Sequence, residues 1–368
     1  MSVTSFHDLQ VASVEPQGDG AVALHLRVTP ELLTTFAFAP GQYLTLRAEI
    51  GGSDLRRCYS IASTPRHLTQ HGEVVVGVRA IAGGRFSNWA NTQLRAGQHL
   101  RVMPPQGRFS PQRPRALHRV GFAAGSGITP ILSILTDTLE SSDKAKFTLV
   151  YGNRRMSSVM FNEALQDLKD RYASRLTLVH ILSRQAQEVD LLEGRIDAAK
   201  VRAVVDALLP VASMDEVFVC GPEGMPGTVR DTLVALGVPE RRIQTEHFIP
   251  ADDASNFVAT SPDPTLAAGQ KDSEKSAVTL RIVLDGKTHE FRADGTLSVL
   301  DAALDAGLDL PYSCKAGVCC TCRARVLDGE VDMARNFSLE AGEIERGFVL
   351  TCQARARTPS VSISYDER

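Results

Sequence analysis

The sequence lacks a surplus of basic residues, since 40 Lys and Arg stand against 43 Asp and Glu and give a formal net charge of -3. Binding to nucleic acid needs basic side chains that neutralise phosphates, so nucleic acid is excluded as the main partner. No stretch approaches the roughly 18 consecutive apolar residues of a membrane-spanning helix. The N-terminus also lacks a basic segment followed by an apolar run. We therefore expect no membrane span, no secretory signal and a cytoplasmic protein.

Histidine–carboxylate pairs in a recognisable spacing are missing as well. The nine histidines are scattered along the chain, and none stands in a spacing typical of metal ligands. The sequence therefore predicts chemistry that needs no side chain as a general acid or base.

The chain of 368 residues is long enough for two or three domains. Residues 1–112 contain short alternating apolar runs such as VALHLRV and QYLTLRAEI, which predict a small antiparallel β-barrel. In residues 113–249, apolar strands such as FTLVYGN alternate with helical patterns such as FNEALQDLKDRYA. This alternation predicts an α/β domain with a parallel sheet of the nucleotide-binding type.

A third zone is separated from the first two by residues 250–275, whose Ala, Asp, Ser and Pro content is typical of a linker with a coil-like span of about 28 Å. Residues 276–368 begin with a predicted hairpin that turns at the Asp-Gly pair 285–286. A predicted helix, capped by Ser298 and ended by Gly307, follows.

Four of the seven cysteines lie within the run PYSCKAGVCCTCRARV. Cys314, Cys319 and Cys322 have the spacing C-x4-C-x2-C, and Cys352 follows in VLTCQA. In the reducing cytoplasm such a group indicates a metal site rather than disulfides. This spacing is the plant-type [2Fe–2S] pattern, so the predicted cluster ligands are Cys314, Cys319, Cys322 and Cys352.

Two further residues of this run bear on the metal. Gly317 permits backbone conformations that bring amide N–H groups toward the ligand sulfurs. Zinc is the alternative metal, although a zinc ribbon usually has two C-x2-C pairs. Cys320 lies between two predicted ligands. We interpret it as a small buried or half-buried thiol; the other interpretation is that it is an alternative ligand.

A low-potential cluster needs an electron donor, and two patterns of the first zone indicate a flavin. RRCYSIAS places Arg57, Tyr59 and Ser60 at a strand end, where they can pair with a pyrophosphate, lie against an aromatic ring and reach a ring nitrogen. In GGRFSNW, two glycines allow close backbone approach, and the amides that follow, with Ser87 at the start of a helix, form a phosphate site. A packed strand end and a plain glycine turn are the alternatives.

Two strand-to-helix turns of the second zone indicate a nucleotide. GFAAGSGITPIL departs from the dinucleotide fingerprint because Pro130 replaces the third glycine. VFVCGPEGM repeats the strand-then-glycine pattern at a second strand end. Both turns are expected at the carboxyl edge of the sheet, where α/β sheets bind ligands. Cys220 is a candidate to line the hydride-transfer position, with a small apolar strand residue as the alternative.

Together these motifs resemble the ferredoxin–NADP reductase superfamily. That resemblance implies FAD and a nicotinamide nucleotide as cofactors, with Ser60, Thr129 and Cys220 beside the reacting rings. The residues that it assigns to the flavin are Arg57, Tyr59, Ser60, Gly84, Arg85, Phe86, Ser87 and Phe248. The residues that it assigns to the nucleotide are Gly125, Gly127, Thr129, Cys220, Gly221 and Pro222.

The segments GGRFSNWAN, VMPPQGRF, SCKAGVCCTCRARVLDGEVDM and GFVLTCQA resemble the reductase subunits of phenylacetyl-CoA epoxidases and their close relatives. The likeness implies a β-grasp ferredoxin domain at the C-terminus and electron flow from NADPH through FAD and [2Fe–2S] to a separate di-iron oxygenase. Two positions depart from the family pattern. His247 replaces an Arg before the Phe248 that can cover the flavin, and Ala316 replaces a common Gly.

The choice of nucleotide depends on HILSRQ. Ser183 and Arg184 resemble the residues that bind the 2′-phosphate in NADP-dependent members, and Arg154 and Arg155 lie nearby in YGNRR. We therefore predict NADPH, with NADH as the alternative. Another terminal oxygenase, such as a Rieske dioxygenase, a ketosteroid hydroxylase or a desaturase, is the alternative partner. A cluster-based redox sensor is the alternative function.

Overall fold

The computed structural model describes residues 5–248 and 277–367. The chain divides into two compact units, one formed by residues 5–248 and the other containing residues 277–367. The predicted linker, residues 250–275, lies outside the described residues. Within the described ranges, no helix has both the length and the apolar character needed to cross a membrane.

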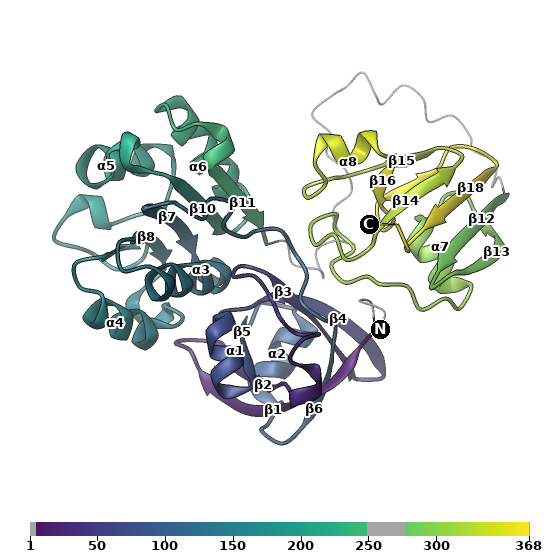
Figure 1. The fold of residues 1–368 in the computed structure, drawn as a ribbon, viewed down its shortest axis with the longest axis horizontal. Coiled ribbons are helices and arrows are strands. Elements are labelled where there is room, and N and C mark those ends of the chain that lie inside the picture. The colour runs from purple at the N-terminus through teal and green to yellow at the C-terminus, as the bar shows by residue number, and fades with distance from the viewer. Residues whose placement is uncertain (1–4, 249–276, 368) are drawn as a thin grey trace. The chain divides into compact units, whose positions relative to one another are not determined.

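The first part of the N-terminal unit is a six-stranded antiparallel sheet in the order β4-β3-β6-β1-β2-β5. The sheet curls so that Ile61, after β4, forms a bridge with Val76 of β5 (Figure 1). Alternate residues such as Leu24 and Leu26 point into a buried apolar core. Its strands are β1 (His7–Pro16), β2 (Ala21–Arg27), β3 (Tyr43–Ile50), β4 (Ser53–Ser60), β5 (Glu73–Arg79) and β6 (His99–Val102). The predicted barrel is thus confirmed as a curled antiparallel sheet.

Two helices accompany this sheet. Helix α1 (Pro65–His71) begins after Thr64, whose hydroxyl accepts a hydrogen bond from the His67 amide. Helix α2 (Arg85–Thr92) begins after Gly84. The expectation that Ser87 begins this helix was wrong, because Gly84 takes the N-cap position and Ser87 lies within the first turn.

The second part of the N-terminal unit is a five-stranded, fully parallel sheet in the order β11-β10-β7-β8-β9. Helices α3 and α4 cover one face, and α5 and α6 cover the other (Figure 1). The strands are β7 (His118–Ala124), β8 (Lys146–Asn153), β9 (Leu176–Leu182), β10 (Glu216–Gly221) and β11 (Ile243–His247). The helices are α3 (Ile128–Ser141), α4 (Asn162–Arg171), α5 (Ala198–Leu208) and α6 (Met225–Ala235). This arrangement confirms the predicted α/β domain.

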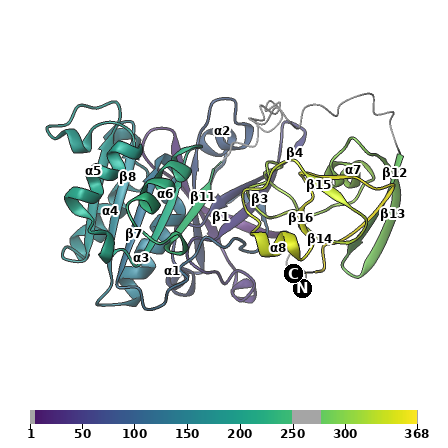
Figure 2. The ribbon, with the colours of Figure 1, turned by 90° about the horizontal axis from the view of Figure 1, so that it is seen from above.

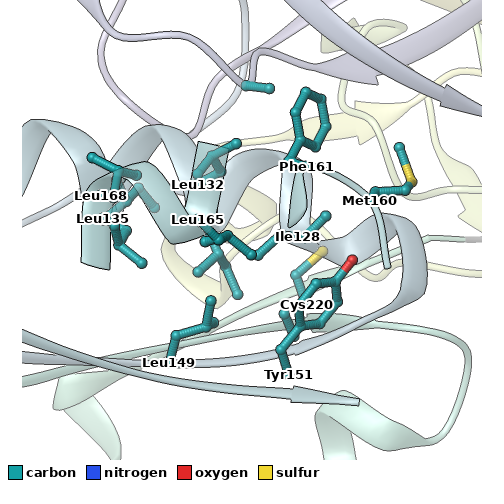
Figure 3. Packing of buried hydrophobic residues seen from close by; sticks show 14 of the residues in the cluster. Ile128, Leu132, Leu135, Leu149, Tyr151, Met160, Phe161, Leu165, Leu168 and Cys220 are labelled. Carbon is teal, nitrogen blue, oxygen red and sulfur yellow. The ribbon is translucent and has the colours of Figure 1, made fainter. Parts of the chain in front are cut away.

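One apolar core joins the two parts of this unit. Leu132 and Leu135 of α3 pack with Leu165 of α4, and Tyr151 and Cys220 lie in the same cluster (Figure 3). Ala23 and Val75 of the curled sheet belong to this cluster too. At Gly77 of β5 a β-carbon would lie 2.6 Å from the Thr129 methyl group and 2.9 Å from the side chains of two further neighbours. Backbone of the curled sheet therefore lies directly against the nucleotide-type domain.

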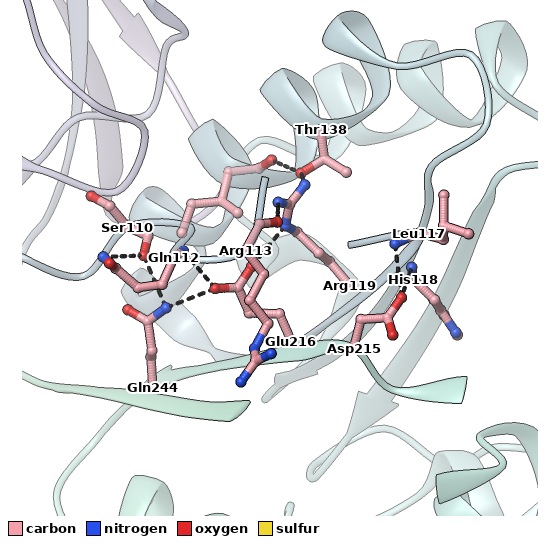
Figure 4. Close-up of polar contacts among 11 residues, drawn as sticks. Ser110, Gln112, Arg113, Leu117, His118, Arg119, Thr138, Asp215, Glu216 and Gln244 are labelled. Carbon is pink, nitrogen blue, oxygen red and sulfur yellow. Dashed lines mark hydrogen bonds and ion pairs between the residues drawn. The ribbon is translucent and has the colours of Figure 1, made fainter. Parts of the chain in front are cut away.

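A buried polar network ties the segment between the two parts to the parallel sheet (Figure 4). The Glu216 carboxylate accepts hydrogen bonds from Arg119 Nε at 3.0 Å and from the Gln112 amide at 2.6 Å. Arg119 also donates to the Arg113 carbonyl at 2.7 Å, and Gln244 donates to both Glu216 and the Ser110 carbonyl. The side chains of Arg119 and Glu216 are only 9% and 1% exposed. The pair is thus a desolvated charge pair that further hydrogen bonds support.

The C-terminal unit contains a five-stranded mixed sheet in the order β13-β12-β18-β14-β16, with a separate β15–β17 pair. Figure 2 shows β12 and β13 side by side at one edge. The strands are β12 (Ala277–Leu284), β13 (Lys287–Asp294), β14 (Arg323–Asp328), β15 (Val331–Met333), β16 (Phe348–Leu350), β17 (Ala354–Ala356) and β18 (Ser360–Ser364). The helices are α7 (Val299–Asp305) and α8 (Ala341–Glu345).

Two local predictions for this unit are confirmed. Asp285 and Gly286 turn the β12–β13 hairpin with φ values of 50° and 73°. Ser298 caps α7 by accepting a hydrogen bond from the Asp301 amide at 3.1 Å, and Gly307 follows the helix with a φ of 84°. The six short 3-10 helices of the chain are Pro30–Leu32, Gly125–Gly127, Met156–Ser158, Asp190–Leu192, Val211–Ser213 and Glu240–Arg242, counted in the described residues.

Candidate functional site: a flavin–nucleotide edge and a cysteine loop

The end of β4 carries the three residues predicted to hold the flavin. Arg57 and Tyr59 are half-buried on one face of the strand, and Ser60 is buried at its end. The Tyr59 ring lies 5.6 Å from the Phe86 ring, and Arg57 Nη1 donates to the Arg56 carbonyl at 2.9 Å. Ser60 Oγ donates to Glu246 Oε2 at 3.4 Å. Ser60 therefore points toward β11, 186 residues further along the chain.

The Gly84–Ser87 turn is packed tightly by its own side chains. A β-carbon at Gly84 would collide with Ile81 and lie 2.5 Å from Ser87 Oγ. The Phe86 side chain is 1% exposed in the barrel core, and the Arg85 guanidinium donates to the Ile50 carbonyl. These side chains leave the backbone amides at the start of α2 as the groups that can receive a phosphate.

The two glycine turns of the parallel sheet are in direct backbone contact. Gly125 has a φ of 53°, and its carbonyl accepts a hydrogen bond from the Tyr151 hydroxyl at 2.8 Å. A β-carbon at Gly127 would collide with the Cys220 carbonyl. Thr129 is buried, and its hydroxyl donates to the Ser126 carbonyl. Both turns thus meet at the carboxyl edge of the sheet, as the strand directions predicted.

The second of these turns begins with a buried thiol. Cys220 is fully buried at the end of β10, inside the apolar core shown in Figure 3. Gly221 follows, and a β-carbon there would lie 2.5 Å from the Met225 sulfur. Pro222 is exposed, and its carbonyl accepts the Met225 amide at 3.2 Å. Cys220 is therefore held rigidly and faces the interior.

Glu246 completes this edge, and no sequence motif marked it. Glu246 pairs with Cys220 in the parallel register of β10 and β11, and Cys220 Sγ lies 3.9 Å from Glu246 Oε2. Desolvation by burial raises the pKa of the Glu246 carboxyl to about 8, while hydrogen bonds from Ser60 and Cys220 oppose this rise. The carboxyl group is therefore mostly protonated at neutral pH. We call Ser60, Thr129, Cys220 and Glu246 the flavin–nucleotide edge.

The thiol beside this carboxyl is also held neutral. Burial, and secondly the neighbouring Glu246, raise the pKa of Cys220 well above its usual value. A neutral thiol and a neutral acid next to Ser60 form a group of proton donors rather than a charged pair. This arrangement can hold or move a proton, which the scattered histidines of the sequence did not suggest.

The last two described residues of the N-terminal unit follow Glu246. Phe248 is half-buried and packs against the apolar core that contains Cys220. Desolvation by burial, then the charge of Arg230, lowers the pKa of His247, so this ring is neutral at pH 7. His247 therefore adds no positive charge to the edge.

The residues predicted for a 2′-phosphate meet at the ends of β8 and β9. The amides of Ser183 and Arg184 donate to the carbonyls of Asn153 and Arg154, both at 2.9 Å. Arg154 and Arg184 are exposed, and neither forms an ion pair with any carboxylate of the described ranges. Arg154 also contributes to the lowered pKa of Arg79, which desolvation causes in the first place. Two exposed guanidinium groups that form no ion pair in the described ranges thus lie beside these strand ends, although Glu193 bridges Leu182 at the end of β9.

The four predicted cluster ligands converge in the C-terminal unit. Cys319, Cys322 and Cys352 are buried and Cys314 is half-buried, and all four are free thiols. Hydrogen bonding between Cys314 and Cys319, and between Cys322 and Cys352, raises the pKa of Cys314 and of Cys322 well above its usual value, and burial adds to both shifts. We call residues 314–322 with Cys352 the cluster loop. Thiols so crowded ionise together only around cationic metal, which fits a [2Fe–2S] cluster.

The backbone of the cluster loop supplies donors to its sulfurs. The Ala316 amide lies 3.4 Å from Cys314 Sγ, and the Val318 amide also donates to that sulfur. Gly317 has a φ of 77°, in the left-handed region that glycine favours. Cys320 has a φ of 54° and packs against the apolar core of the unit. That placement agrees with the interpretation of Cys320 as a packed thiol.

Three protein-family models match the chain along its length. An oxidoreductase FAD-binding domain matches residues 19–110, and an oxidoreductase NAD-binding domain matches residues 122–231. A 2Fe-2S iron-sulfur cluster binding domain matches residues 282–357. The predicted cofactors, a flavin, a nicotinamide nucleotide and a [2Fe–2S] cluster, are thereby confirmed.

Curated relatives match the chain over nearly its whole length. It is 44% identical to one of the subunits of the 1,2-phenylacetyl-CoA epoxidase of Escherichia coli, over 100% of this chain and 99% of that protein. It is 35% identical to the ferredoxin reductase component of 3-ketosteroid-9-alpha-monooxygenase from Rhodococcus rhodochrous, over 97% of this chain and 96% of that protein.

A solved structure supports the same fold. Phthalate dioxygenase reductase, described as a modular structure for electron transfer from pyridine nucleotides to [2Fe–2S], has a TM-score of 0.58 and 24% identity, covering 98% of both chains. An intact type IV self-sufficient cytochrome P450 monooxygenase has a TM-score of 0.67 and 21% identity, covering 97% of this chain and 41% of that chain. Both likenesses concern the fold alone. The chain is an oxidoreductase and belongs, like its relative from the 1,2-phenylacetyl-CoA epoxidase, to the ferredoxin–NADP reductase-like family with a C-terminal ferredoxin domain.

Proposed function

We propose that this oxidoreductase takes electron pairs from NADPH and delivers them singly to the di-iron oxygenase of a phenylacetyl-CoA epoxidase. The observation that carries the proposal is the 44% identity, across the full chain, to a component of that enzyme. Reductase components of oxygenases recur among the other relatives, which supports an oxygenase as the electron acceptor. The choice of this oxygenase rests on the stronger similarity to the epoxidase component than to the ketosteroid monooxygenase component.

The residues of the flavin–nucleotide edge prepare the site for electron transfer. Bound FAD accepts electrons in pairs from a nicotinamide and releases them one at a time, and a [2Fe–2S] cluster carries one electron. Glu246 holds a proton at its carboxyl group at neutral pH, and Ser60 connects that carboxyl to the end of β4. Thr129, Cys220 and Phe248 exclude water from this edge because their side chains are buried or half-buried.

The residues at the ends of β8 and β9 select the nucleotide. Arg184 and Arg154 provide exposed guanidinium groups that form no ion pair in the described ranges, and Ser183 provides a hydroxyl beside them. A guanidinium and a hydroxyl bind a phosphate well, whereas an acidic residue would bind a free 2′-hydroxyl. These residues therefore favour NADPH over NADH.

The cluster loop receives and releases the single electrons. Cys314, Cys319, Cys322 and Cys352 are the ligands of the cluster in this proposal, and the Ala316 and Val318 amides lie toward the Cys314 sulfur. Amide donors stabilise negative charge on ligand sulfurs and so raise the reduction potential.

Reconstitution with purified partners tests the proposal. The holoprotein is mixed with the catalytic subunits of the E. coli phenylacetyl-CoA epoxidase, phenylacetyl-CoA and NADPH, and coupled substrate consumption is expected. The ketosteroid monooxygenase terminal component serves as a parallel acceptor. Coupling to that component alone would refute the proposed partner. Slow NADPH oxidation with every acceptor, including ferricyanide, would refute the reductase function and favour a redox sensor.

A further inference from the structure

Two strands of the curled sheet and helix α1 bring together two histidines and a glutamate that are not part of the flavin–nucleotide edge. His25 lies on β2, His67 on α1 and Glu73 at the start of β5. One ligand atom from each residue lies within 4.8 Å of the others. All three residues are half-buried. The sequence shows no such group, because the first histidine is far from the second along the chain and no spacing rule links them.

We propose that His25, His67 and Glu73 bind one divalent transition-metal ion, with Zn²⁺ preferred among the metals that suit imidazole. Two imidazoles and one carboxylate are a known ligand set for Zn²⁺ with an open fourth position. Imidazole ligands select zinc, copper or nickel over the hard ions magnesium and calcium. The site would join α1 to strands β2 and β5.

The distances fit a site that is nearly formed. Ligand atoms at about 2.0–2.1 Å from a tetrahedral zinc lie roughly 3.4 Å apart. His25 Nδ1 and Glu73 Oε2 are already 3.5 Å apart. All ligand atoms lie within 4.8 Å of one another, so His67 must move closer by at most about 1.4 Å, which rotation about its χ angles provides.

The neighbours of the ligands support metal binding in two ways. His25 Nε2 lies 3.4 Å from Glu15 Oε2, so the imidazole has one nitrogen toward Glu73 and the other toward a carboxylate. Carboxylate–histidine–metal chains of this kind orient metal-binding imidazoles. His67 Nε2 is buried and has no hydrogen-bond partner among the described residues. Such an enclosed nitrogen is costly unless it gains a partner.

One neighbour opposes the metal. Arg27 Nη2 lies 3.4 Å from Glu73 Oε1, the other oxygen of the carboxylate. Its side chain is 57% exposed, so the guanidinium can turn toward solvent when a cation binds. Side-chain exposures of 20% for His25 and 19% for Glu73 also leave the group open to ions from solution.

Zinc binding by the tag-free holoprotein tests the proposal. The protein is treated with a chelator, desalted and titrated with Zn²⁺ against a zinc indicator, and bound zinc is measured by mass spectrometry. One equivalent is expected to bind, and His67→Gln and Glu73→Gln should each weaken this binding at least tenfold. Glu15→Gln should weaken it by about tenfold, as loss of an outer carboxylate typically does. Zinc should also raise the melting temperature of the wild-type protein.

Two controls separate this site from other zinc sites. His99→Gln changes an exposed histidine on β6 of the same sheet and should bind zinc as the wild type does. Flavin absorbance and iron content confirm that each variant is folded and keeps its cluster, so that free cluster cysteines do not take up zinc. No zinc binding by the wild type, or unchanged binding in both His67→Gln and Glu73→Gln, would overturn the proposal.

Discussion

The cluster loop and the flavin–nucleotide edge depend on their side chains in different ways. Three of the proposed cluster ligands come from one short loop, and in the proposal all four thiols hold the same group. At the flavin–nucleotide edge, β4, α3, β10 and β11 each contribute one residue, and separate contacts join some of them, such as the 3.4 Å hydrogen bond between Ser60 and Glu246. We therefore expect the loss of any one ligand in the cluster loop to abolish cluster binding. The loss of one residue at the flavin–nucleotide edge should lower the rate of flavin reduction only in part.

The largest effect is expected from Cys352→Ser. Serine oxygen is a poor substitute for a thiolate as an iron ligand, so the cluster should be lost and electron delivery to protein acceptors should fall to background. Flavin reduction by NADPH should continue at the wild-type rate, because the edge lies in the other unit. Stopped-flow flavin absorbance and acid-labile sulfide content measure the two outcomes. Wild-type cluster content in this variant would show that Cys352 is not needed to hold the cluster.

A large effect on stability is expected from Glu216→Gln. This change leaves the buried Arg119 charge without its partner, which typically costs about 3–5 kcal/mol in the free energy of unfolding. The midpoint of chemical denaturation, monitored by flavin release, should therefore move to a lower denaturant concentration. The midpoint monitored by cluster bleaching should stay the same, because the cluster belongs to the other unit. Glu223→Gln, an exposed glutamate of the same domain, is the matched control. An unshifted flavin transition would contradict the role of this charge pair.

An intermediate effect is expected from Glu246→Gln. Loss of the acid should slow flavin reduction by about 10- to 100-fold, the equivalent of one strong hydrogen bond. In the wild type the rate should fall as pH rises through about 8, because Glu246 then ionises. The variant should lack this pH dependence. A wild-type pH profile in the variant would assign the titration to another group.

The same carboxyl predicts a pH effect on stability. Its folded pKa of about 8 lies above the usual 4.5, so the folded protein holds a proton that the unfolded chain releases. The contribution of Glu246 is therefore largest below pH 4.5 and is lost as pH rises toward 8. Glu246→Gln should flatten the decline of unfolding free energy between these pH values, measured by denaturation of the flavin-containing unit.

A smaller and selective effect is expected from Arg184→Ala. Loss of one exposed guanidinium should lower kcat/KM for NADPH by about tenfold, the equivalent of a charged hydrogen bond of about 1.5 kcal/mol. The value for NADH should remain unchanged. Arg171→Ala, an exposed arginine on α4 of the same domain, should alter neither. Equal losses with both nucleotides would refute the assignment of Arg184 to a 2′-phosphate.

The smallest effect is expected from Cys320→Ser. The thiol packs against the apolar core of its unit, so the hydroxyl should cost a little stability and leave iron and sulfide content unchanged. The absorbance of the cluster measures this outcome. Loss of iron comparable to that of Cys352→Ser would identify Cys320 as a ligand, and the ligand assignment of the cluster loop would have to change.

Local features of the chain could be predicted from the sequence. The spacing of Cys314, Cys319 and Cys322 predicted the [2Fe–2S] domain that the family model confirms, because the cysteines of this pattern are neighbours in the chain. The Ser298 cap and the turn at Gly286 were predicted for the same reason, since each depends on a few adjacent residues. The start of α2 was misplaced within its first turn, because both Gly84 and Ser87 are acceptable caps and only packing decides between them.

Features that depend on distant contacts could not be predicted in this way. Glu246 meets Ser60 only because β11 pairs with β10 and the curled sheet packs against both. The sequence TEHF drew attention to His247 and Phe248, but nothing in it marked the glutamate before them. The parallel pairing of β10 and β11 is the one signal that places Glu246 beside Cys220. The same limit applies to His25, His67 and Glu73.

Gly77 allows the two domains of the N-terminal unit to pack closely against each other. Because a β-carbon there would overlap the Thr129 methyl group, the curled sheet and the nucleotide-type domain pack closely at this point. This contact is made when the unit folds, so each incoming nucleotide meets two surfaces that are already packed together. Gly77→Ala would force the two surfaces apart.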